Sequence, residues 1–229
     1  MSRLAVVVIG AGGRMGQLAS RLLETTSGFA LAASVHSAEE LAPVLEHPAA
    51  QLGLDFTVAG RGFEHGLALL AAGLRPVIGT SGVDFEETEQ LDRRARELGL
   101  GGLVVPNFSL GMACLQAAAV RAARAFDRAE IVELHHEKKR DAPSATAQHT
   151  AQLLCAEGGM SEVPVHSVRL PGLYAHQEVL LGSPGETLTL RHDMLGPEAF
   201  APGILLALRH AATAVGVAHG LRHALEGET

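Results

Sequence analysis

The chain has 229 residues, of which 47% are hydrophobic, so we expect one large domain or two small ones with a substantial buried core. Its 25 acidic and 18 basic residues give a net charge of −7 near neutral pH, which argues against a nucleic-acid partner. No run of about 18 apolar residues predicts a membrane span, and the short apolar start does not resemble a signal peptide, so we expect a cytoplasmic protein.

The first half of the chain alternates short apolar runs with helix-like segments. Strands are predicted, in chain order, at residues 4–9, 29–35, 51–57, 75–79 and 102–105. Helices are predicted at residues 15–24, 66–72, 86–98 and 110–125. Strands that alternate with helices of roughly 10–15 residues are typical of right-handed βαβ units, so we predict a parallel sheet.

Strand-like runs dominate the second half of the chain. They are predicted at residues 129–135, 165–170, 174–181 and 186–192. A helix is predicted at 145–157, and a helix at 203–215 is expected to close the chain. Neighbouring strands joined by short turns indicate an antiparallel or mixed sheet. The prediction is an α/β fold with a parallel-sheet domain at 1–109 with 198–229, and a smaller α+β domain with a mixed sheet at 110–197.

The two cysteines, Cys114 and Cys155, each lie in an apolar stretch with a helix-like pattern. Disulfides are rare in reducing compartments, where such thiols stay free. We therefore predict two buried free thiols of a cytosolic protein.

A glycine-rich turn, Gly-Ala-Gly-Gly-Arg-Met-Gly, follows the first predicted strand. Such a turn before a helix places backbone N–H groups against a pyrophosphate and lets the chain approach it closely. The pattern G-x-G-x-x-G fails at Met15, whereas the spacing Gly10-x-x-Gly13-x-x-Gly16 fits. A tight turn without a ligand is the alternative. We favour a dinucleotide site in a Rossmann-like domain, with contacts from Gly10, Ala11, Gly12, Gly13, Arg14 and Met15.

The end of the second predicted strand bears on the choice of dinucleotide. It reads Ser34-Val35-His36-Ser37, with no acidic residue before Glu39. A carboxylate at this place binds the ribose hydroxyls of NADH, and it would repel the 2′-phosphate of NADPH. Its absence, with His36 and Arg14 nearby, favours NADPH, while NADH stays acceptable. The alternative is that His36 is a surface residue without this role.

Two further loops follow predicted strands at the same edge of the sheet, where open α/β sheets bind their ligands. Their small hydroxyl and amide side chains suit a nicotinamide and its ribose, although each loop taken alone is an ordinary turn. The candidate residues are Gly79, Thr80 and Ser81 in one loop, and Val105, Pro106, Asn107 and Phe108 in the other.

Adjacent histidines, His135 and His136, end the strand predicted at 129–135. Neighbouring residues of a strand point to opposite faces, so one ring can face a cleft while the other packs. This geometry makes a poor metal pair, and no metal is expected. Imidazole groups suit proton transfer near neutral pH.

Three cations, Lys138 to Arg140, follow after Glu137 and would more often form a solvated loop. However, Asp141-Ala142-Pro143-Ser144 is typical of a helix entry, with Ser144 as the N-cap. A helix N-terminus with hydroxyl groups at Ser144 and Thr146 favours an anion, and a lysine nearby adds charge-assisted bonds. The sequence therefore predicts a site for a carboxylate.

Several segments together resemble one family. The glycine turn is followed in order by Leu-Asp-Phe-Thr, Ile-Gly-Thr-Ser-Gly, Pro-Asn-Phe-Ser and Glu-Leu-His-His-x-x-Lys-x-Asp-Ala-Pro-Ser-x-Thr-Ala. This order resembles that of bacterial dihydrodipicolinate reductase (4-hydroxy-tetrahydrodipicolinate reductase) of the lysine and diaminopimelate pathway. The similarity continues through His166–Gly172, Ala175–Glu178 and Leu190–Asp193, and so covers nearly the whole chain.

The resemblance implies hydride transfer from NADPH or NADH to a small cyclic dicarboxylate. It implies that His135 donates or accepts a proton, that Lys139 is a second proton donor, and that the substrate is bound by His136, Ser144, Ala145 and Thr146. It also implies that the second domain binds substrate and assembles a homotetramer through its sheet.

Two positions depart from the family pattern. Ala145 stands where the family usually has glycine; alanine would strain a loop with positive φ or crowd the carboxylate, but it costs nothing in the first turn of a helix. Gly196-Pro197-Glu198 stands where the family usually has an arginine. Two alternatives therefore stay open: a cofactor-binding regulator that has lost catalysis, and a reductase of another small imino or keto acid.

Overall fold

The structure is a computed structural model that describes residues 3–226. The chain divides into two compact units. One unit contains the residues up to Phe108 together with those from Phe200 onward, and the other contains Ser109–Ala199. Within residues 3–226 no helix is long and apolar enough to cross a membrane.

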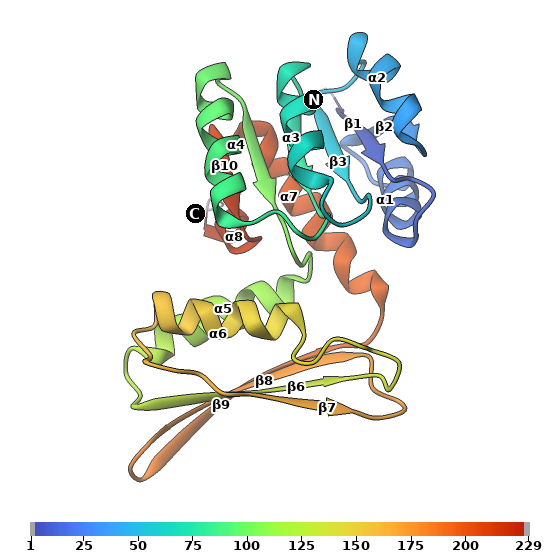
Figure 1. The fold of residues 1–229 in the computed structure, drawn as a ribbon. Helices are drawn as coiled ribbons and strands as arrows, with labels where there is room; N and C mark the ends of the chain where they lie inside the picture. The colour runs from blue at the N-terminus through green and yellow to red at the C-terminus, as the bar shows by residue number, and fades with distance from the viewer. Residues whose placement is uncertain (1–2, 227–229) are drawn as a thin grey trace. The chain divides into compact units, whose positions relative to one another are not determined.

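The first unit contains a parallel sheet, as predicted (Figure 1). Its described strands are β1 (Leu4–Ile9), β2 (Phe29–Val35), β3 (Leu52–Asp55), β4 (Arg75–Ile78), β5 (Gly101–Val104) and β10 (Gly216–His219). They lie in the order β10-β5-β4-β3-β1-β2, and each neighbouring pair is parallel. Strand β2 follows β1 in the chain and lies on one side of it, whereas the next strand, β3, lies on the other side. Ligands of open α/β sheets bind beyond the carboxyl ends of the strands at such a reversal.

Helices pack on both faces of this sheet. They are α1 (Arg14–Thr25), α2 (Ala38–Glu46), α3 (Gly62–Ala71), α4 (Phe85–Leu98), α7 (Ala201–Thr213) and the short α8 (Arg222–Glu226). Helices α1 and α7 contact each other and the sheet. Helices α2, α3 and α4 supply the apolar side chains Leu41, Leu69, Leu70 and Leu91 to clusters that include Val7, Ile9 and Ile78 of the strands. Buried strands with apolar residues on both sides explain the near-continuous hydrophobic runs of the sequence.

Three elements of this unit were not predicted. The segment after β2 was assigned no helix, but it forms α2, which contains Pro43. The helix predicted at 203–215 was expected to close the chain, and this is wrong because β10 and α8 follow it. Strand β10 has only four residues, begins at Gly216, whose φ is +94°, and pairs with β5. A run this short carries no periodic signal, so the neighbouring strand determines its structure.

The second unit contains the mixed sheet that the sequence predicted. Its elements are α5 (Leu110–Ala123), β6 (Arg128–His135), α6 (Ala145–Ala156), β7 (Val165–Arg169), β8 (Ala175–Ser183), β9 (Glu186–Met194) and the 3₁₀ helix η1 (Pro197–Phe200) at its end. The strand order is β7-β6-β8-β9. Strand β6 is parallel to β7, whereas β6 with β8 and β8 with β9 are antiparallel.

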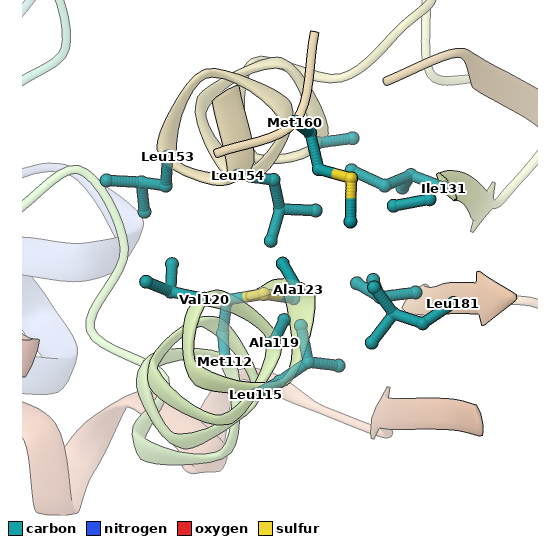
Figure 2. Packing of buried hydrophobic residues seen from close by; sticks show 13 residues of the cluster. Met112, Leu115, Ala119, Val120, Ala123, Ile131, Leu153, Leu154, Met160 and Leu181 are labelled. Atoms are coloured by element: carbon teal, nitrogen blue, oxygen red, sulfur yellow. The ribbon is translucent and has the colours of Figure 1, made fainter. Parts of the chain in front are cut away.

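One core holds α5, α6 and the sheet of this unit together (Figure 2). Leu154 of α6 points toward α5, where Val120 and Ala123 lie, and Ile131 of β6 and Leu181 of β8 close the cluster from the sheet side. On β6, the buried residues alternate with more exposed ones, because side chains of a strand alternate between its faces. The apolar row of β6 therefore faces the two helices.

The prediction of two buried thiols is wrong. Cys114 and Cys155 are free, but both are exposed. Each lies on a helix of the second unit, α5 or α6, and the helical pattern that fixes its direction leaves it on the outer side. An apolar sequence neighbourhood therefore did not determine which face a residue occupies.

We predict that Leu154→Ala lowers the free energy of unfolding by about 2–5 kcal/mol, because it opens a cavity between α5, α6 and the sheet. Leu154 is fully buried, whereas Leu195 is 82% exposed. Leu195→Ala is therefore the matched control and should change stability by less than about 0.5 kcal/mol. Urea unfolding followed by circular dichroism measures both, and equal effects of the two substitutions would contradict the packing described here.

Candidate functional site

The glycine turn between β1 and α1 is tight enough to require glycine. Gly10 has a φ of +80°, and a Cβ there would lie 2.6 Å from the carbonyl oxygen of Phe56. A Cβ at Gly16 would overlap the carbonyl oxygen of Gly10. Helix α1 begins after Gly13 without a side-chain cap and without an acidic residue in its first turn. The start of this helix therefore has the form of an anion site.

A cavity of about 430 Å³ lies beside this turn. Its size, its apolar walls and its position at the glycine turn before α1 suit part of a nucleotide. None of the described residues that line it is acidic. The lining residues are Ile9, Gly10, Gly12, Gly13, Val35, His36, Ser37, Leu41, Phe56, Thr57, Val58, Arg61 and His65.

Four of the predicted cofactor residues line this cavity: Gly10, Gly12, Gly13 and His36. Ala11 is buried, and its N–H donates to the carbonyl oxygen of Val35 at 3.0 Å. Arg14 and Met15 lie in the first turn of α1, beyond the cavity lining. The structure therefore brings the turn and the end of β2 together, as expected for residues that follow adjacent parallel strands.

The other predicted cofactor residues follow β4 and β5 at the same edge of the sheet, and they do not line the cavity. Gly79 donates its N–H to the carbonyl oxygen of Asp55, and Val105 donates its N–H to that of Ile78. Ser81 and Pro106 are exposed and Asn107 is half-buried. Phe108 is buried and packs edge-on against Phe56, with ring centroids 5.3 Å apart. Phe108 therefore has a packing role in this unit.

Asp55, at the end of β3, is a buried carboxylate that the sequence did not single out. Its Oδ1 accepts from the N–H of Thr57 at 2.8 Å and from the hydroxyl of Thr80 at 3.0 Å. Its Oδ2 lies 3.1 Å from Nδ1 of His65, whose ring lines the cavity. Burial opposes ionisation, but the hydrogen bonds from His65 and Thr57 outweigh it and lower the pKa of Asp55. The hydroxyl of Thr80, a predicted cofactor residue, therefore donates its hydrogen bond to Asp55 in this structure.

Two charged residues that were not predicted, Glu40 and Arg61, lie near the end of β2 or line the cavity beside it. Glu40 lies beyond the segment in which an acidic residue was sought, yet its Oε2 accepts from the backbone N–H of His36 at 2.7 Å. Arg61 lines the cavity and pairs with Glu64 at 2.7 Å across one helical turn. The sequence did not identify Arg61, because no periodic or motif signal marks the loop between β3 and α3.

In the second unit, the end of β6 brings together a buried carboxylate and a histidine. Glu133 is fully buried, and its Oε2 makes a short hydrogen bond with Nδ1 of His135. Arg169, at the end of β7, donates to Glu133 through both terminal nitrogens, at 2.7 and 2.9 Å. Glu133 and His135 are two residues apart on one strand, so their side chains share a face.

The loop after β6 carries Lys139, which is partly buried, with 22% of its side chain exposed. Its Nζ lies 2.9 Å from Oδ2 of Asp141. The carbonyl oxygen of Asp141 in turn accepts from Arg169 at 2.7 Å. His136 is exposed, and its carbonyl oxygen accepts from the N–H of Lys139. The two predicted proton donors, His135 and Lys139, are thus linked through shared partners.

The predicted carboxylate cradle lies at the start of α6. Ser144 is the N-cap, as predicted: its hydroxyl accepts from the N–H of Ala147 at 3.2 Å. Ala145 is the first residue of the helix and is exposed, and Thr146 is half-buried. Every residue with positive φ in the described backbone is a glycine, so Ala145 carries no strain of that kind. The substitution of alanine for glycine is therefore compatible with this backbone.

Two acid–base groups at this place have shifted pKa values. Burial alone would raise the pKa of Glu133, but hydrogen bonds, the strongest from Arg169, lower it, so Glu133 is ionised. Burial lowers the pKa of His135, and the Glu133 carboxylate opposes this effect. His135 therefore gives up its proton more readily than a free imidazole.

Two other features complete the described unit. His176 pairs with Asp193 at 2.6 Å on β8 and β9, and Pro197 begins the 3₁₀ helix η1.

Among the described residues, no group of three or more His, Cys, Asp or Glu side chains is arranged to hold a metal ion. The sequence could have indicated Glu133 through its spacing from His135, but only the pairing of β6 with β7 identifies Arg169 as its partner.

Comparison with known proteins assigns both halves of the chain to one family. The sequence model of the dihydrodipicolinate reductase N-terminus matches residues 4–108, and that of the C-terminus matches residues 111–225. The chain is 37% identical to the 4-hydroxy-tetrahydrodipicolinate reductase of Moorella thermoacetica and 41% identical to that of Streptomyces griseus, with 99% of both chains covered in each case. The solved structure of dipicolinate-bound dihydrodipicolinate reductase from Paenisporosarcina sp. TG-14 superposes with a TM-score of 0.86, at 30% identity, over 96% of this chain and 99% of that one.

We predict that Asp55→Asn lowers the free energy of unfolding at pH 7 by about 1–3 kcal/mol, because an amide cannot accept all the donors around this buried site. The folded-state pKa of Asp55 lies below its unfolded value of 3.8, so its stabilisation is present above that pH and is lost as pH falls through the folded pKa. The difference between wild type and variant should therefore shrink in acid.

Urea unfolding at pH 7 and at several acidic pH values measures this difference. The control is Asp127→Asn, which removes the same charge from an exposed position. An effect of Asp55→Asn no larger than that of the control would show that the hydrogen bonds to Asp55 contribute nothing to folding.

Proposed function

The chain belongs to the dihydrodipicolinate reductase family, and we propose that it uses His135 and Lys139 as the proton-transfer groups of the family's reaction. It is an oxidoreductase with 4-hydroxy-tetrahydrodipicolinate reductase activity in lysine biosynthesis. We propose NAD(P)H as its reductant. The observation that supports these roles is the hydrogen bond between His135 and buried Glu133. His135 lies four residues before Lys139, and both lie within the segment that matches the family.

The substrate is a small dicarboxylate, and the second unit offers groups that suit it. The start of α6 carries the hydroxyl of Thr146, and an anion is stabilised at such a helix end. Exposed Lys138 and Arg140 add positive charge in the preceding loop, which also contains exposed His136. We assign substrate binding to His136 and to the turn that contains Ser144, Ala145 and Thr146.

Proton transfer follows from the tautomer of His135. The Glu133 carboxylate can only accept, so Nδ1 of His135 carries a proton, and Nε2 is the nitrogen that exchanges a proton with a ligand. Lys139 Nζ, held by Asp141, is a second donor with a fixed charge that stabilises negative charge developing on the substrate. The bound nicotinamide supplies the hydride. The side chains of this chain supply and stabilise the proton and the charge around it.

For the cofactor, we assign binding to the glycine turn, Gly10–Met15, to His36, and to the loops after β4 and β5 at Gly79–Ser81 and Val105–Phe108. We further propose that NADPH is preferred over NADH. Support comes from the cavity lining, which includes His36 and Arg61 and no acidic residue among its described members. A guanidinium suits a 2′-phosphate because it makes charge-assisted hydrogen bonds.

We also propose a cytoplasmic homotetramer assembled through the mixed sheet. Helices α5 and α6 cover one face of that sheet, and the residues that alternate with the buried row point to its other face. Size-exclusion chromatography with light scattering tests the assembly, and a monomeric mass at micromolar concentration would exclude it.

The decisive experiment is nicotinamide oxidation with substrate generated in place by a dihydrodipicolinate synthase from pyruvate and aspartate semialdehyde. Rapid oxidation is expected, because the acid–base residues are complete and Ala145 is accommodated without positive φ. Cofactor binding without turnover would instead favour a regulator, with Pro197 in place of the arginine as the suspect. Turnover only with another imino or keto acid would favour the alternative of a reductase that acts on that acid.

We predict that His135→Gln and Lys139→Ala each lower kcat by about 10²–10⁴-fold, the range that general acid–base catalysis contributes. Both residues belong to the second unit, so the affinity for NADPH, measured by fluorescence titration, should change little. If either variant kept full turnover, its assignment as a proton-transfer group would be wrong.

We predict that Arg61→Ala raises the KM for NADPH about tenfold, which corresponds to 1.4 kcal/mol, and leaves that for NADH nearly unchanged. The matched control is Arg94→Ala, because Arg94 and Glu97 form the same kind of pair, 2.8 Å apart across one helical turn, away from the cavity lining. Steady-state kinetics with both cofactors measures the two effects. Equal changes for NADPH and NADH would remove Arg61 from recognition of the 2′-phosphate.

A further inference from the structure

We propose that Glu133, clamped by Arg169, is a positioning residue for both proton-transfer groups: it orients the imidazole of His135 and ties the loop of Lys139 to the end of β6. This inference rests on the function proposed above. It concerns residues to which that proposal gives no catalytic contact.

Glu133 interrupts an apolar row. Ala129, Ile131 and Glu133 are the buried positions of β6, and His135 is the next residue on the same face. The first two side chains belong to the hydrophobic core under α5 and α6. An ionised carboxylate at the third place costs several kcal/mol unless its water is replaced by donors. Glu133 therefore either stabilises the fold of this unit or positions His135 beside it.

Both oxygens of Glu133 are occupied by donors. Oε2 receives His135 Nδ1 and an Arg169 nitrogen, and Oε1 receives the second Arg169 nitrogen and the backbone N–H of Ser144 at 3.2 Å. A carboxylate with this set of donors does not rotate freely. The ring of His135 is consequently held in one tautomer and one orientation, with Nε2 as its exchanging nitrogen.

Arg169 extends this control to Lys139. The nitrogen that donates to Glu133 Oε1 also donates to the carbonyl oxygen of Asp141, and the Asp141 carboxylate pairs with Lys139. The same guanidinium thus fixes the end of the strand that carries His135 and the loop that carries Lys139. The hydrogen bond from Ser144 to Glu133 joins the start of α6, the proposed carboxylate cradle, to the same carboxylate.

A purely structural role for this ion pair makes different predictions. Removing one partner of a buried pair destabilises a protein, whereas removing both charges together is often neutral. A structural role is therefore rescued by a double substitution that leaves no unpaired charge. A positioning role is not rescued, because the histidine still lacks its carboxylate.

The experiment measures kcat, KM and the pH profile of kcat for Glu133→Gln, Glu133→Asp and the double variant Glu133→Gln/Arg169→Met in the full chain. All three should lower kcat by roughly 10²-fold, the lower end of the contribution of general acid–base catalysis, and leave the KM for NADPH within about twofold. Circular dichroism and NADPH titration establish that each variant is folded. Glu133→Asp keeps the charge that balances Arg169, so it tests the position of the carboxylate even if the amide variant fails to fold.

The pH profile separates positioning from general damage. Burial lowers the pKa of His135, as do Lys139 and Arg169, while Glu133 opposes them and raises it. In Glu133→Gln, His135 should therefore lose its proton at a lower pH than in the wild type. The alkaline decline in kcat, where protonated His135 is needed, should move to lower pH by a measurable amount.

The chain offers a matched control on the same pair of strands. Glu130 of β6 and His166 of β7 form a carboxylate–imidazole pair at 2.8 Å, with 56% and 54% of their side chains exposed. Glu130→Gln removes the same chemical group from the same strand away from His135, so it should keep wild-type kcat and pH profile. An equal loss in Glu130→Gln would overturn the proposal, since the effect would then be one of the sheet.

A double-mutant cycle with His135→Gln distinguishes failure of this inference from failure of the proposed function. If Glu133 acts mainly through His135, then Glu133→Gln should reduce kcat in the His135→Gln background by less than about fivefold, because interacting residues are not additive. A full 10²-fold loss in that background, or recovery of wild-type kcat in the double variant lacking both charges, would overturn the positioning role. Full turnover of His135→Gln alone would instead overturn the proposed function.

Discussion

A carboxylate that is buried near the end of a strand organises each unit of this protein. An ionised carboxylate is stable in the interior only where donors replace the water it has lost. Asp55 of β3 and Glu133 of β6 are both fully buried, and the loop that follows each strand supplies one of the donors. After β3, the N–H of Thr57 donates to Asp55, and after β6, the N–H of Ser144 donates to Glu133. The course of each loop is thus tied to the neutralisation of one charge.

The two carboxylates are satisfied in different ways, and the difference matters for the chemistry near them. Asp55 is held by a backbone N–H, a hydroxyl and an imidazole, so His65 is the group that stands between its charge and the cavity. Glu133 is held by the guanidinium of Arg169, which cancels its charge outright. A negative charge near a proposed pyrophosphate site must be separated from it, whereas one beside a proposed acid–base histidine must be fixed in place. Each set of donors suits its own unit.

Sequence periodicity predicted most of the architecture, because the strands of the first unit are continuous apolar runs and those of the second alternate. It missed α2, which contains Pro43, and the short elements β10 and α8. The glycine turn and the N-cap at Ser144 were predictable because they depend on local geometry. Arg169 could not be assigned to Glu133 from sequence, since 36 residues separate them and only the register of β6 with β7 makes them neighbours. The prediction of buried thiols failed because the apolar neighbourhood of Cys114 and Cys155 does not determine which face of its helix each residue occupies.

The acidic balance of the chain does not oppose binding of a dianionic ligand. Charges farther apart than about 8–10 Å are largely screened at physiological ionic strength, so the net charge of −7 matters less than the groups at the site. There, the Glu133–Arg169 and Asp141–Lys139 pairs cancel. Lys138 and Arg140 are exposed and have no ion pair within 4.0 Å in the described part of the chain. Glu137 in the same loop is exposed as well, so outside the fixed pairs the loop carries two positive charges and one negative charge. This net positive charge, together with the start of α6, favours carboxylates.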